Sequence, residues 1–244
     1  MTLKFLRKVF ICIFLSLISA VLINYNVESA GVSPMVINLE AKPGAERDFQ
    51  IVLTADKHEE KVNVSLYQLV QLIDGSLNYR KIQDLNSYEP AQWVKLDKRK
   101  IILHPGHKKV IRGKVKVPLQ ARGTKTVVLM LRTRKENKSG LQYVIQYAVR
   151  INIRVKTPGL RPQVKILDID LRKNNEGLPR MVVHVKNPSL LDCVLSGEAT
   201  IRDSNNRLVD RVKLISPALE KTNYTTIRVY PVSIIKITGL IKKD

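Results

Sequence analysis

Residues 93–118 read WVKLDKRKIILHPGHKKVIRGKVKVP and contain three short apolar segments separated by charged and turn-forming residues. Pro105 and Gly106 stand together between the second and third segments, a pair that favours a tight turn. In the third segment, apolar residues at 111, 115 and 117 alternate with cations at 112, 114 and 116. Because successive side chains of a strand point to opposite faces, one face would meet a core and the other solvent. This stretch predicts consecutive β-strands joined by turns.

The same pattern extends through the rest of the chain. From residue 31 onward, short β-branched runs are separated by Pro, Gly, Asn and Asp, and no segment has a convincing helical periodicity. The longest run, 141–155 (LQYVIQYAVRINIRV), has fifteen residues, whereas an average strand has about five or six. We refer to it as the long strand. The sequence therefore predicts an all-β protein built from immunoglobulin-like sandwiches.

Two such sandwiches are expected, following an N-terminal signal peptide. Residues 158–162 belong to a stretch rich in proline and glycine, which is typical of a linker. The linker divides a first immunoglobulin-like domain at 31–157 from a second at 163–244. The second is short beside the roughly 100 residues of a seven-stranded sandwich, and no closing strand pair precedes its end. We therefore expect the second sandwich to be incomplete.

The N-terminal segment 1–29 has the composition of a secretory signal peptide. Three cations lie within the first eight residues, residues 9–23 carry no charge, and polar residues follow. We expect cleavage after Ser29 or Ala30. The alternative is an uncleaved anchor, but a run of fifteen uncharged residues falls short of the roughly 20 that span a bilayer. The sequence therefore predicts a periplasmic or otherwise extracytoplasmic protein.

The charge of the chain is strongly positive and unevenly distributed. Lys and Arg number 42 against 21 Asp and Glu, a formal net charge of +21. Residues 95–138 alone hold fifteen cations and two acids. One interpretation is a polyanion-binding face, and the other is a solvated surface that keeps edge strands from aggregating. Nucleic acid is not expected as a partner, because the chain is exported and lacks interleaved stacking aromatics. The candidate face consists of Arg112, Lys114, Lys116, Arg132 and Arg134.

Motifs for catalysis and for metal or cofactor binding are missing from the sequence. It contains no Gly-x-Ser-x-Gly elbow, P-loop, dinucleotide-binding glycine turn or HExxH pair. His104 and His107 flank the Pro-Gly turn, but no third ligand follows from the sequence. Cys193, the one cysteine outside the signal peptide, is expected to be a buried apolar residue. We therefore expect a protein that is not an enzyme, with no catalytic residue, metal site or cofactor.

The order of several features resembles the periplasmic pilus-assembly chaperones. These features are Trp93, the Pro-Gly turn at 105–106, Val117 before Pro118, and the long strand followed by a proline-containing linker. The same order resembles equally the wider group of bacterial immunoglobulin-fold chaperone-like proteins. The resemblance implies an exported chaperone that binds pilus or other surface subunits by β-strand addition, with an outer-membrane usher as a further partner. The alternative is a structural or adhesive module that binds an anionic envelope polymer through its basic face.

Strand addition of this kind needs a long edge strand with an alternating apolar row, because backbone hydrogen bonds supply affinity and alternate side chains fill the groove of the subunit. The long strand offers such a row. The alternative is that the strand is paired within its own sheet and that the row faces its own core. The candidate subunit-binding residues are Tyr143, Ile145, Tyr147, Val149, Ile151 and Ile153.

The resemblance also implies an anchor for the C-terminal carboxylate of the subunit. Members of the family use one Arg near the first strand and one Lys on the long strand, which hold the carboxylate by charge-assisted hydrogen bonds. In this chain the first strand, at 35–39, has no cation, and Asn152 stands where the family has its Lys. Arg150 and Arg154 flank that position. The candidate anchor is therefore formed by Arg150, Asn152 and Arg154.

Overall fold

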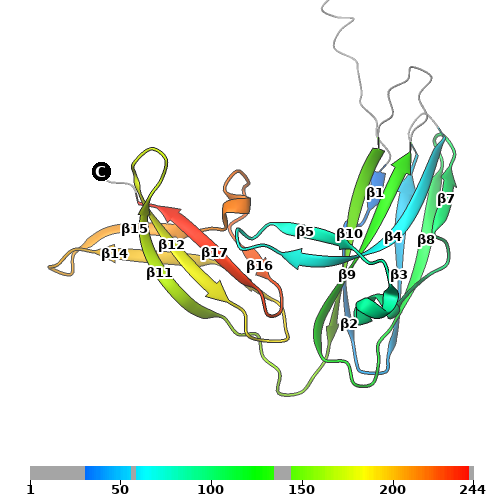
Figure 1. Ribbon diagram of the computed structural model, residues 1–244, viewed down its shortest axis with the longest axis horizontal. Coiled ribbons are helices and arrows are strands. Elements are labelled where there is room, and N and C mark those ends of the chain that lie inside the picture. The colour runs from blue at the N-terminus through cyan, green and yellow to red at the C-terminus, as the bar shows by residue number, and fades with distance from the viewer. Residues whose placement is uncertain (1–30, 56–58, 135–143, 242–244) are drawn as a thin grey trace, which may run out of the picture.

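A computed structural model describes residues 31–55, 59–134 and 144–241. Nearly all regular structure in these ranges is β, and the strands form two separate β-sandwiches (Figure 1). The predicted all-β fold with two immunoglobulin-like domains is thereby confirmed. The predicted signal peptide lies outside the described residues. Within the described ranges, no helix has the length and apolar character needed to cross a membrane.

The first sandwich consists of two sheets that face each other. One has the strand order β1-β3-β8-β6, and the other has the order β2-β10-β9-β4-β5, with β7 also paired to β4. A 3-10 helix η1 (Leu85–Ser87) and a short helix α2 (Glu89–Gln92) connect β5 to β6. The strands are β1 (Gly31–Ser33), β2 (Val36–Ala41), β3 (Glu46–Thr54), β4 (Glu60–Gln71), β5 (Leu77–Lys81), β6 (Val94–Leu96), β7 (Lys100–Leu103), β8 (Lys108–Lys116), β9 (Gly123–Arg134) and β10 (Val144–Val155).

The chain enters this sandwich by crossing from one sheet to the other. β1 pairs antiparallel with β3, and after the cis Ser33–Pro34 peptide β2 pairs parallel with β10. The pairing with β10 begins at Val36 opposite Arg150 and ends at Ala41 opposite Val155. β9 covers the other side of β10 along its whole length. The second half of β10 is therefore enclosed between two strands.

Most of the predicted apolar row of the long strand faces the core between the two sheets. Val149, Ile151 and Ile153 have no exposed surface and belong to the core of the first sandwich. Tyr147 is half-buried against the same core, whereas Ile145 is 38% exposed. Tyr143 lies outside the described residues. The prediction of one continuous subunit-binding row is thus corrected, because its second half packs inside its own domain.

The second sandwich has smaller sheets. β11 (Lys165–Lys173), β12 (Pro179–Lys186) and β17 (Ile234–Leu240) form a three-stranded sheet in that order. Two pairs complete the domain: β13 (Cys193–Leu195) with β16 (Ile227–Val229), and β14 (Gly197–Arg202) with β15 (Leu208–Leu214). A 3-10 helix η2 (Pro217–Leu219) follows β15. The core of the second sandwich includes Val183, Val229 and Ile235, and the half-buried Cys193 packs against this core.

A hairpin of the first sandwich reaches the second. The turn between β4 and β5 projects sideways from the first sandwich (Figure 1). At its tip, the carbonyl of Ile73 accepts a hydrogen bond from the Lys236 N–H (2.6 Å), and the carbonyl of Asp74 accepts one from Ser216 Oγ (2.8 Å). Gly75 has φ +85°, and a Cβ there would lie 2.3 Å from Ser216 Oγ. The turn therefore needs glycine both for its backbone conformation and for its contact with the other domain.

Two further contacts join the domains nearer to the linker. The side-chain amide of Gln71 donates to the carbonyl of Arg228 (2.8 Å) and accepts from the Tyr230 N–H (3.0 Å). Thr124 Oγ1 donates to Asp192 Oδ1 (2.7 Å), and Asp192 also forms an ion pair with Arg228. These bonds come from segments far apart in sequence, so they fix one arrangement of the two sandwiches.

Replacement of Gly75 by Ala is expected to loosen the contact between the domains. The new Cβ would overlap Ser216 and would occupy a left-handed backbone conformation, which costs about 1–2 kcal/mol for a residue other than glycine. We expect faster protease cleavage within 157–162 and a larger radius of gyration in small-angle scattering. Gly177→Ala is the matched control, because Gly177 has φ +79° and nothing within 4 Å. Equal effects of the two substitutions would argue against the hairpin contact.

The burial of the long strand predicts a difference between two isoleucines. Ile151→Ala should lower the free energy of unfolding of the first sandwich by about 2–5 kcal/mol, because it empties part of a closed core. Ile145→Ala should lower it by about 1 kcal/mol or less. Trp93 is the single tryptophan of the chain and is 3% exposed in the first core, so its fluorescence during denaturant unfolding reports on this domain. Similar losses at both positions would contradict the described packing.

Candidate functional site

The first half of β10 is a free sheet edge. Among the described residues, no strand pairs with Val144–Val149 on the side away from β9. The Arg150 N–H donates to the carbonyl of Met35 (3.0 Å), so the backbone groups of Arg150 point away from β9. Because backbone direction alternates along a strand, the N–H and C=O groups of Val144, Gln146 and Ala148 point the same way. They form a row of donors and acceptors directed at an open edge.

The other side-chain row of β10 faces away from the core of the first sandwich. Asn152 lies between Arg150 and Arg154 in this row and is 4% exposed. Its Oδ1 accepts a hydrogen bond from Thr126 Oγ1, and its Nδ2 donates to Asn38 Oδ1, both at 2.9 Å. The amide therefore ties β10 to β9 and β2. Asn152 was expected to contribute to an anchor, but its polar atoms are engaged within the sheet.

Arg150 lies at the point where β2 begins to pair with β10. Its guanidinium Nη1 donates to Tyr230 Oη of the second sandwich at 3.4 Å. Tyr230 is 5% exposed, and burial raises the pKa of its phenol, although the nearby Arg150 lowers it. The phenol therefore stays protonated at neutral pH and keeps a hydroxyl hydrogen to donate. A cation and a hydroxyl from different domains thus lie together at the end of the free edge.

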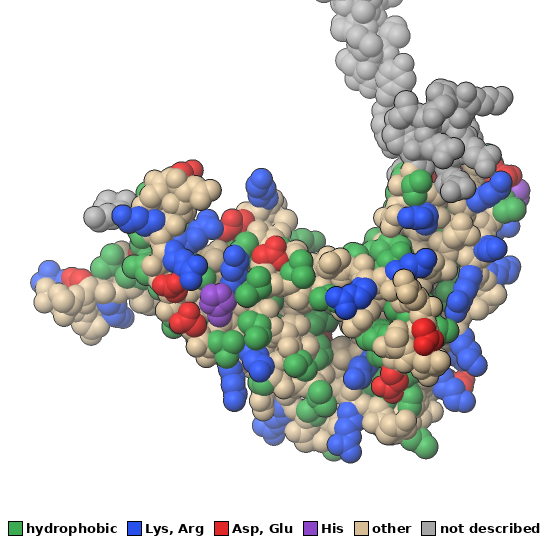
Figure 2. All heavy atoms as spheres, viewed as in Figure 1, with side chains coloured by type: hydrophobic (Ala, Val, Ile, Leu, Met, Phe, Trp, Pro, Cys, Tyr) green, Lys and Arg blue, Asp and Glu red, His purple; other side chains and the backbone are tan. Residues whose placement is uncertain are grey.

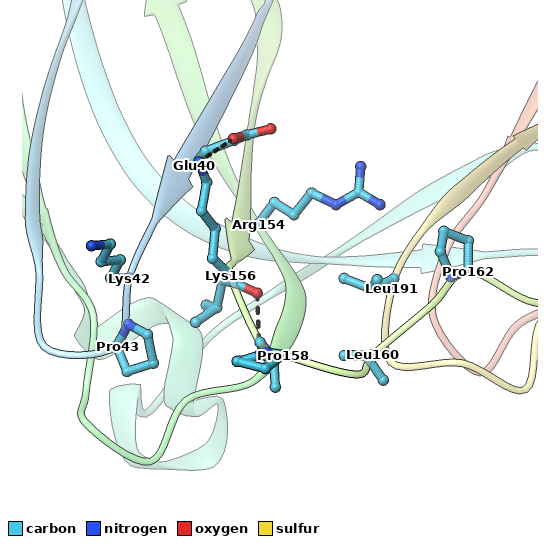
Figure 3. A pocket seen from close by; sticks show the side chains of 11 residues that line it. Glu40, Lys42, Pro43, Arg154, Lys156, Pro158, Leu160, Pro162 and Leu191 are labelled. Carbon is cyan, nitrogen blue, oxygen red and sulfur yellow. Dashed lines mark hydrogen bonds and ion pairs between the residues drawn. The ribbon is translucent and has the colours of Figure 1, made fainter.

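Arg154 lines a separate cavity beside the linker, with a volume of about 830 Å³ (Figure 3). In Figure 3 its side chain points toward Leu191 of the second sandwich, while Lys156 is directed to Glu40. Lys156 Nζ lies 3.1 Å from Glu40 Oε2. Within the described part of the chain, no hydrogen bond or ion pair joins the Arg154 side chain. The prediction missed Lys156, although it continues the alternate row of Arg150 and Arg154.

A second cavity, of about 680 Å³, lies between the sandwiches on the other side of this row. It is lined by the end of β4, by the start of β9 and by the segment around Tyr230. Gln71 and Thr124, which hold the domains together, belong to its wall. The end of this row, from Arg150 to Arg154, is therefore situated in an inter-domain cleft with hollows on both sides.

The candidate polyanion face does not form a single surface. Arg112, Lys114 and Lys116 lie on β8, whereas Arg132 lies on β9 of the opposite sheet, and the side chain of Arg134 is outside the described residues. The outward faces of the two sheets point in opposite directions. The prediction that these five residues form one face is therefore wrong. Alternation in the sequence shows which side chains of a strand face solvent, but it does not show to which sheet the strand belongs.

Acidic residues also offset part of the charge on β8. Lys114 Nζ lies 3.1 Å from Glu46 Oε2 and 3.9 Å from Asp48 Oδ1, and Lys116 Nζ lies 3.9 Å from Glu46 Oε1. The hydrogen bond with Lys114 lowers the pKa of Glu46, and the same contact raises the pKa of Lys114. Figure 2 shows acidic groups among the cations on this outer side of the first sandwich.

One histidine of the pair at the Pro-Gly turn lies next to an acidic side chain. The ring centroids of His104 and His107 are 6.4 Å apart, and His104 Nδ1 lies 3.2 Å from Glu59 Oε2. Across the described ranges, no three His, Cys, Asp or Glu side chains are grouped as metal ligands would be.

Similarity to known proteins is found in the three-dimensional structure but not in the sequence. No family model matches the chain, and no curated protein matches it in sequence. A chain of the chaperone–tip adhesion subunit pre-assembly complex CsuC–CsuE, from the archaic chaperone-usher Csu pili of Acinetobacter baumannii, is 14% identical, with a TM-score of 0.50 over 89% of each chain. The class 5 fimbriae chaperone CfaA is 13% identical, with a TM-score of 0.49 over 84% of each chain.

The match with the Csu complex extends over both sandwiches, since it covers 89% of this chain. The agreement therefore concerns the two-domain arrangement and not a single immunoglobulin-like domain. It also agrees with the resemblance seen in the sequence. The chain has the two-domain β-sandwich fold of the periplasmic pilus chaperones.

Proposed function

We propose that the protein is an exported, non-catalytic chaperone that binds an extracytoplasmic subunit by adding a strand of that subunit to the free edge of β10. The observation that carries this proposal is the position of Arg150, a cation in the inter-domain cleft at the point where the free edge ends. The similar Csu structure is a complex of a chaperone with a tip adhesion subunit from chaperone-usher pili, which supports a pilus-type subunit and an outer-membrane usher as partners.

The length of the free edge suits strand addition. Val144–Val149 spans roughly 20 Å at about 3.3 Å per residue. Each outward N–H donates one hydrogen bond to an added strand, and each outward C=O accepts one. A backbone hydrogen bond contributes about 0.5–1.5 kcal/mol net. Val144 and Ile145 are 48% and 38% exposed at this end, so they offer apolar contact beside the backbone bonds. Along this stretch, affinity then comes from the backbone and from these two side chains.

The position of β2 fixes where an added strand must stop. β2 occupies the edge from Arg150 onward, so a strand that runs parallel to β10 would reach its end beside Arg150. Its C-terminal carboxylate would then meet the guanidinium, with the Tyr230 hydroxyl as a second donor. An antiparallel strand would instead bring its N-terminal ammonium group to Arg150, where like charges repel. The geometry thus favours a subunit whose C-terminal strand runs parallel to β10.

Removal of the Arg150 guanidinium should weaken binding of a free carboxylate. The probe is a fluorescent peptide of about ten residues with alternating apolar side chains, prepared with a C-terminal carboxylate and with a C-terminal amide. A hydrogen bond to a charged group contributes about 1.5–3 kcal/mol, so Arg150→Ala should raise the Kd for the carboxylate peptide about 10- to 100-fold. Arg150→Ala and the unsubstituted chain should bind the amide peptide with the same Kd, because this peptide has no carboxylate for Arg150 to bind.

Arg154→Ala serves as the matched control for this measurement. Arg154 has the same charge and lies in the same side-chain row, but β2 covers the strand edge beside it. Its removal should change the Kd by less than about threefold. A larger effect of Arg154→Ala than of Arg150→Ala would place the carboxylate in the linker cavity and contradict the proposed anchor.

A proline at position 148 should block strand addition without unfolding the domain. The Ala148 N–H points to the open edge, so Ala148→Pro removes a donor that the native sheet does not use, whereas proline elsewhere in a sheet breaks a ladder bond. We expect loss of peptide binding with a near-native unfolding transition of Trp93 fluorescence. Ala148→Gly keeps the N–H and should still bind. Normal binding by the proline variant would exclude this edge as the site.

A further inference from the structure

β11 of the second sandwich exposes an unusual amount of apolar surface. The exposed fractions are 63% for Ile166, 51% for Leu167, 60% for Ile169 and 63% for Leu171. β11 is the outer strand of its sheet, and within the described ranges it pairs only with β12. Natural proteins usually protect such an edge with charges, bulges or a covering segment. β11 has a bulge between Ile166 and Asp168 and charged residues along its length, but its apolar side chains remain uncovered. An uncovered apolar edge of this kind is typical of an association surface.

The exposed residues continue the core face of the domain. In the ladder with β12, Ile169 lies opposite Val183 and Leu171 lies opposite Met181, and opposed residues share a face. Val183 is 3% exposed, so this face is the interior of the sandwich. A groove of about 500 Å³, lined by residues of β11, β12 and β14, opens beside Ile169. The core is therefore closed at β12 and open at β11.

We propose that β11 pairs antiparallel with β11 of a second copy of the same chain, about a two-fold axis that passes beside Asp170. In this register Ile169 lies opposite Leu171 of the second copy, and Asp168 lies opposite Arg172 of the second copy. Each of these pairs occurs twice because of the symmetry. The two sheets merge into one, and the apolar side chains of one copy extend over the groove of the other.

The charges on β11 select this register. A shift by one residue would place the apolar face of one copy opposite the polar face of the other. A register centred on Ile169 would oppose Asp168 and Asp170, which are like charges. A register centred on Leu171 would oppose Ile169 and Lys173. The register centred on Asp170 avoids both conflicts.

One unfavourable contact remains in the chosen register, because the two Asp170 carboxylates meet at the axis. Each is compensated within its own chain: Arg172 Nε donates to Asp170 Oδ2 at 2.6 Å, and this bond lowers the pKa of the carboxyl. Both Arg172 side chains would therefore lie next to the axis. The strand thus carries acids and a base at positions that complement a second copy of itself, which is the reason for choosing this occupant of the edge.

Disulfide trapping tests the register directly. Residues opposed in an antiparallel pair have Cα atoms about 4.5–5.5 Å apart, which lies within the range that a disulfide bridges. In a Cys193→Ser background of the chain without residues 1–29, Asp170→Cys introduces the only cysteine and should therefore give a crosslinked dimer under mild oxidation. Asp168→Cys is the matched control, since its counterpart would lie roughly four residues away along the sheet. Absence of the crosslink at 170, or equal crosslinking at 168, would overturn the proposal.

Sedimentation velocity of the purified chain tests the association itself. We expect a concentration-dependent dimer that Ile169→Lys abolishes and that Val194→Lys, at a residue 58% exposed on β13, leaves intact. Asp168→Arg and Arg172→Asp should each raise the dissociation constant about tenfold, because they oppose like charges. The double variant should restore it to within about threefold. A chain that stays monomeric at about 100 µM, or a double variant as weak as the single ones, would overturn the proposal.

Discussion

The parallel pairing of β2 with the second half of β10 is the constraint on which the rest of the site depends. It closes the edge from Arg150 onward and leaves Val144–Val149 open. On the face toward the opposite sheet, Ile151 and Ile153 are buried in the core of the first sandwich. One contact between strands therefore divides β10 into a structural half and a half that can accept another strand, and Arg150 lies at the boundary.

The second sandwich contributes a hydrogen-bonding group beside Arg150 at this boundary. Tyr230 brings a protonated hydroxyl to Arg150, and it is held there by the bond of its N–H to Gln71 at the end of β4. The hairpin tip and the Thr124–Asp192–Arg228 contacts hold the two domains on either side of the cleft. Most of these bonds involve backbone groups or short polar side chains, so their geometry leaves little freedom. The cleft is therefore shaped by polar contacts between domains rather than by a shared apolar core.

The sequence was sufficient to predict the strands and the two sandwiches, because alternation and turn residues are local signals. It could not distinguish Ile145 from Ile151, which have the same place in the alternating row but different neighbours in space. It also grouped Arg112 with Arg132, since alternation shows that each faces solvent but not that they lie on opposite sheets. Asn152 was predicted to help hold a ligand, and only the positions of Asn38 and Thr126 reveal that its amide is already bonded. In each case the answer depends on which strands and side chains lie beside the residue, and local alternation in the sequence does not show these neighbours.

The open edges of β10 and β11 differ in a way that keeps their proposed partners separate. β10 carries Arg150 at the end of its open edge and no acid between Val144 and Val155, so a second copy of β10 offers no group that complements this cation. β11 carries Asp168, Asp170 and Arg172 in one alternate row, so it can pair with itself. β10 has most of its apolar row buried and offers mainly backbone groups, whereas β11 offers exposed apolar side chains. The charge pattern of each edge therefore favours a foreign strand with a terminal carboxylate at β10 and an identical strand at β11.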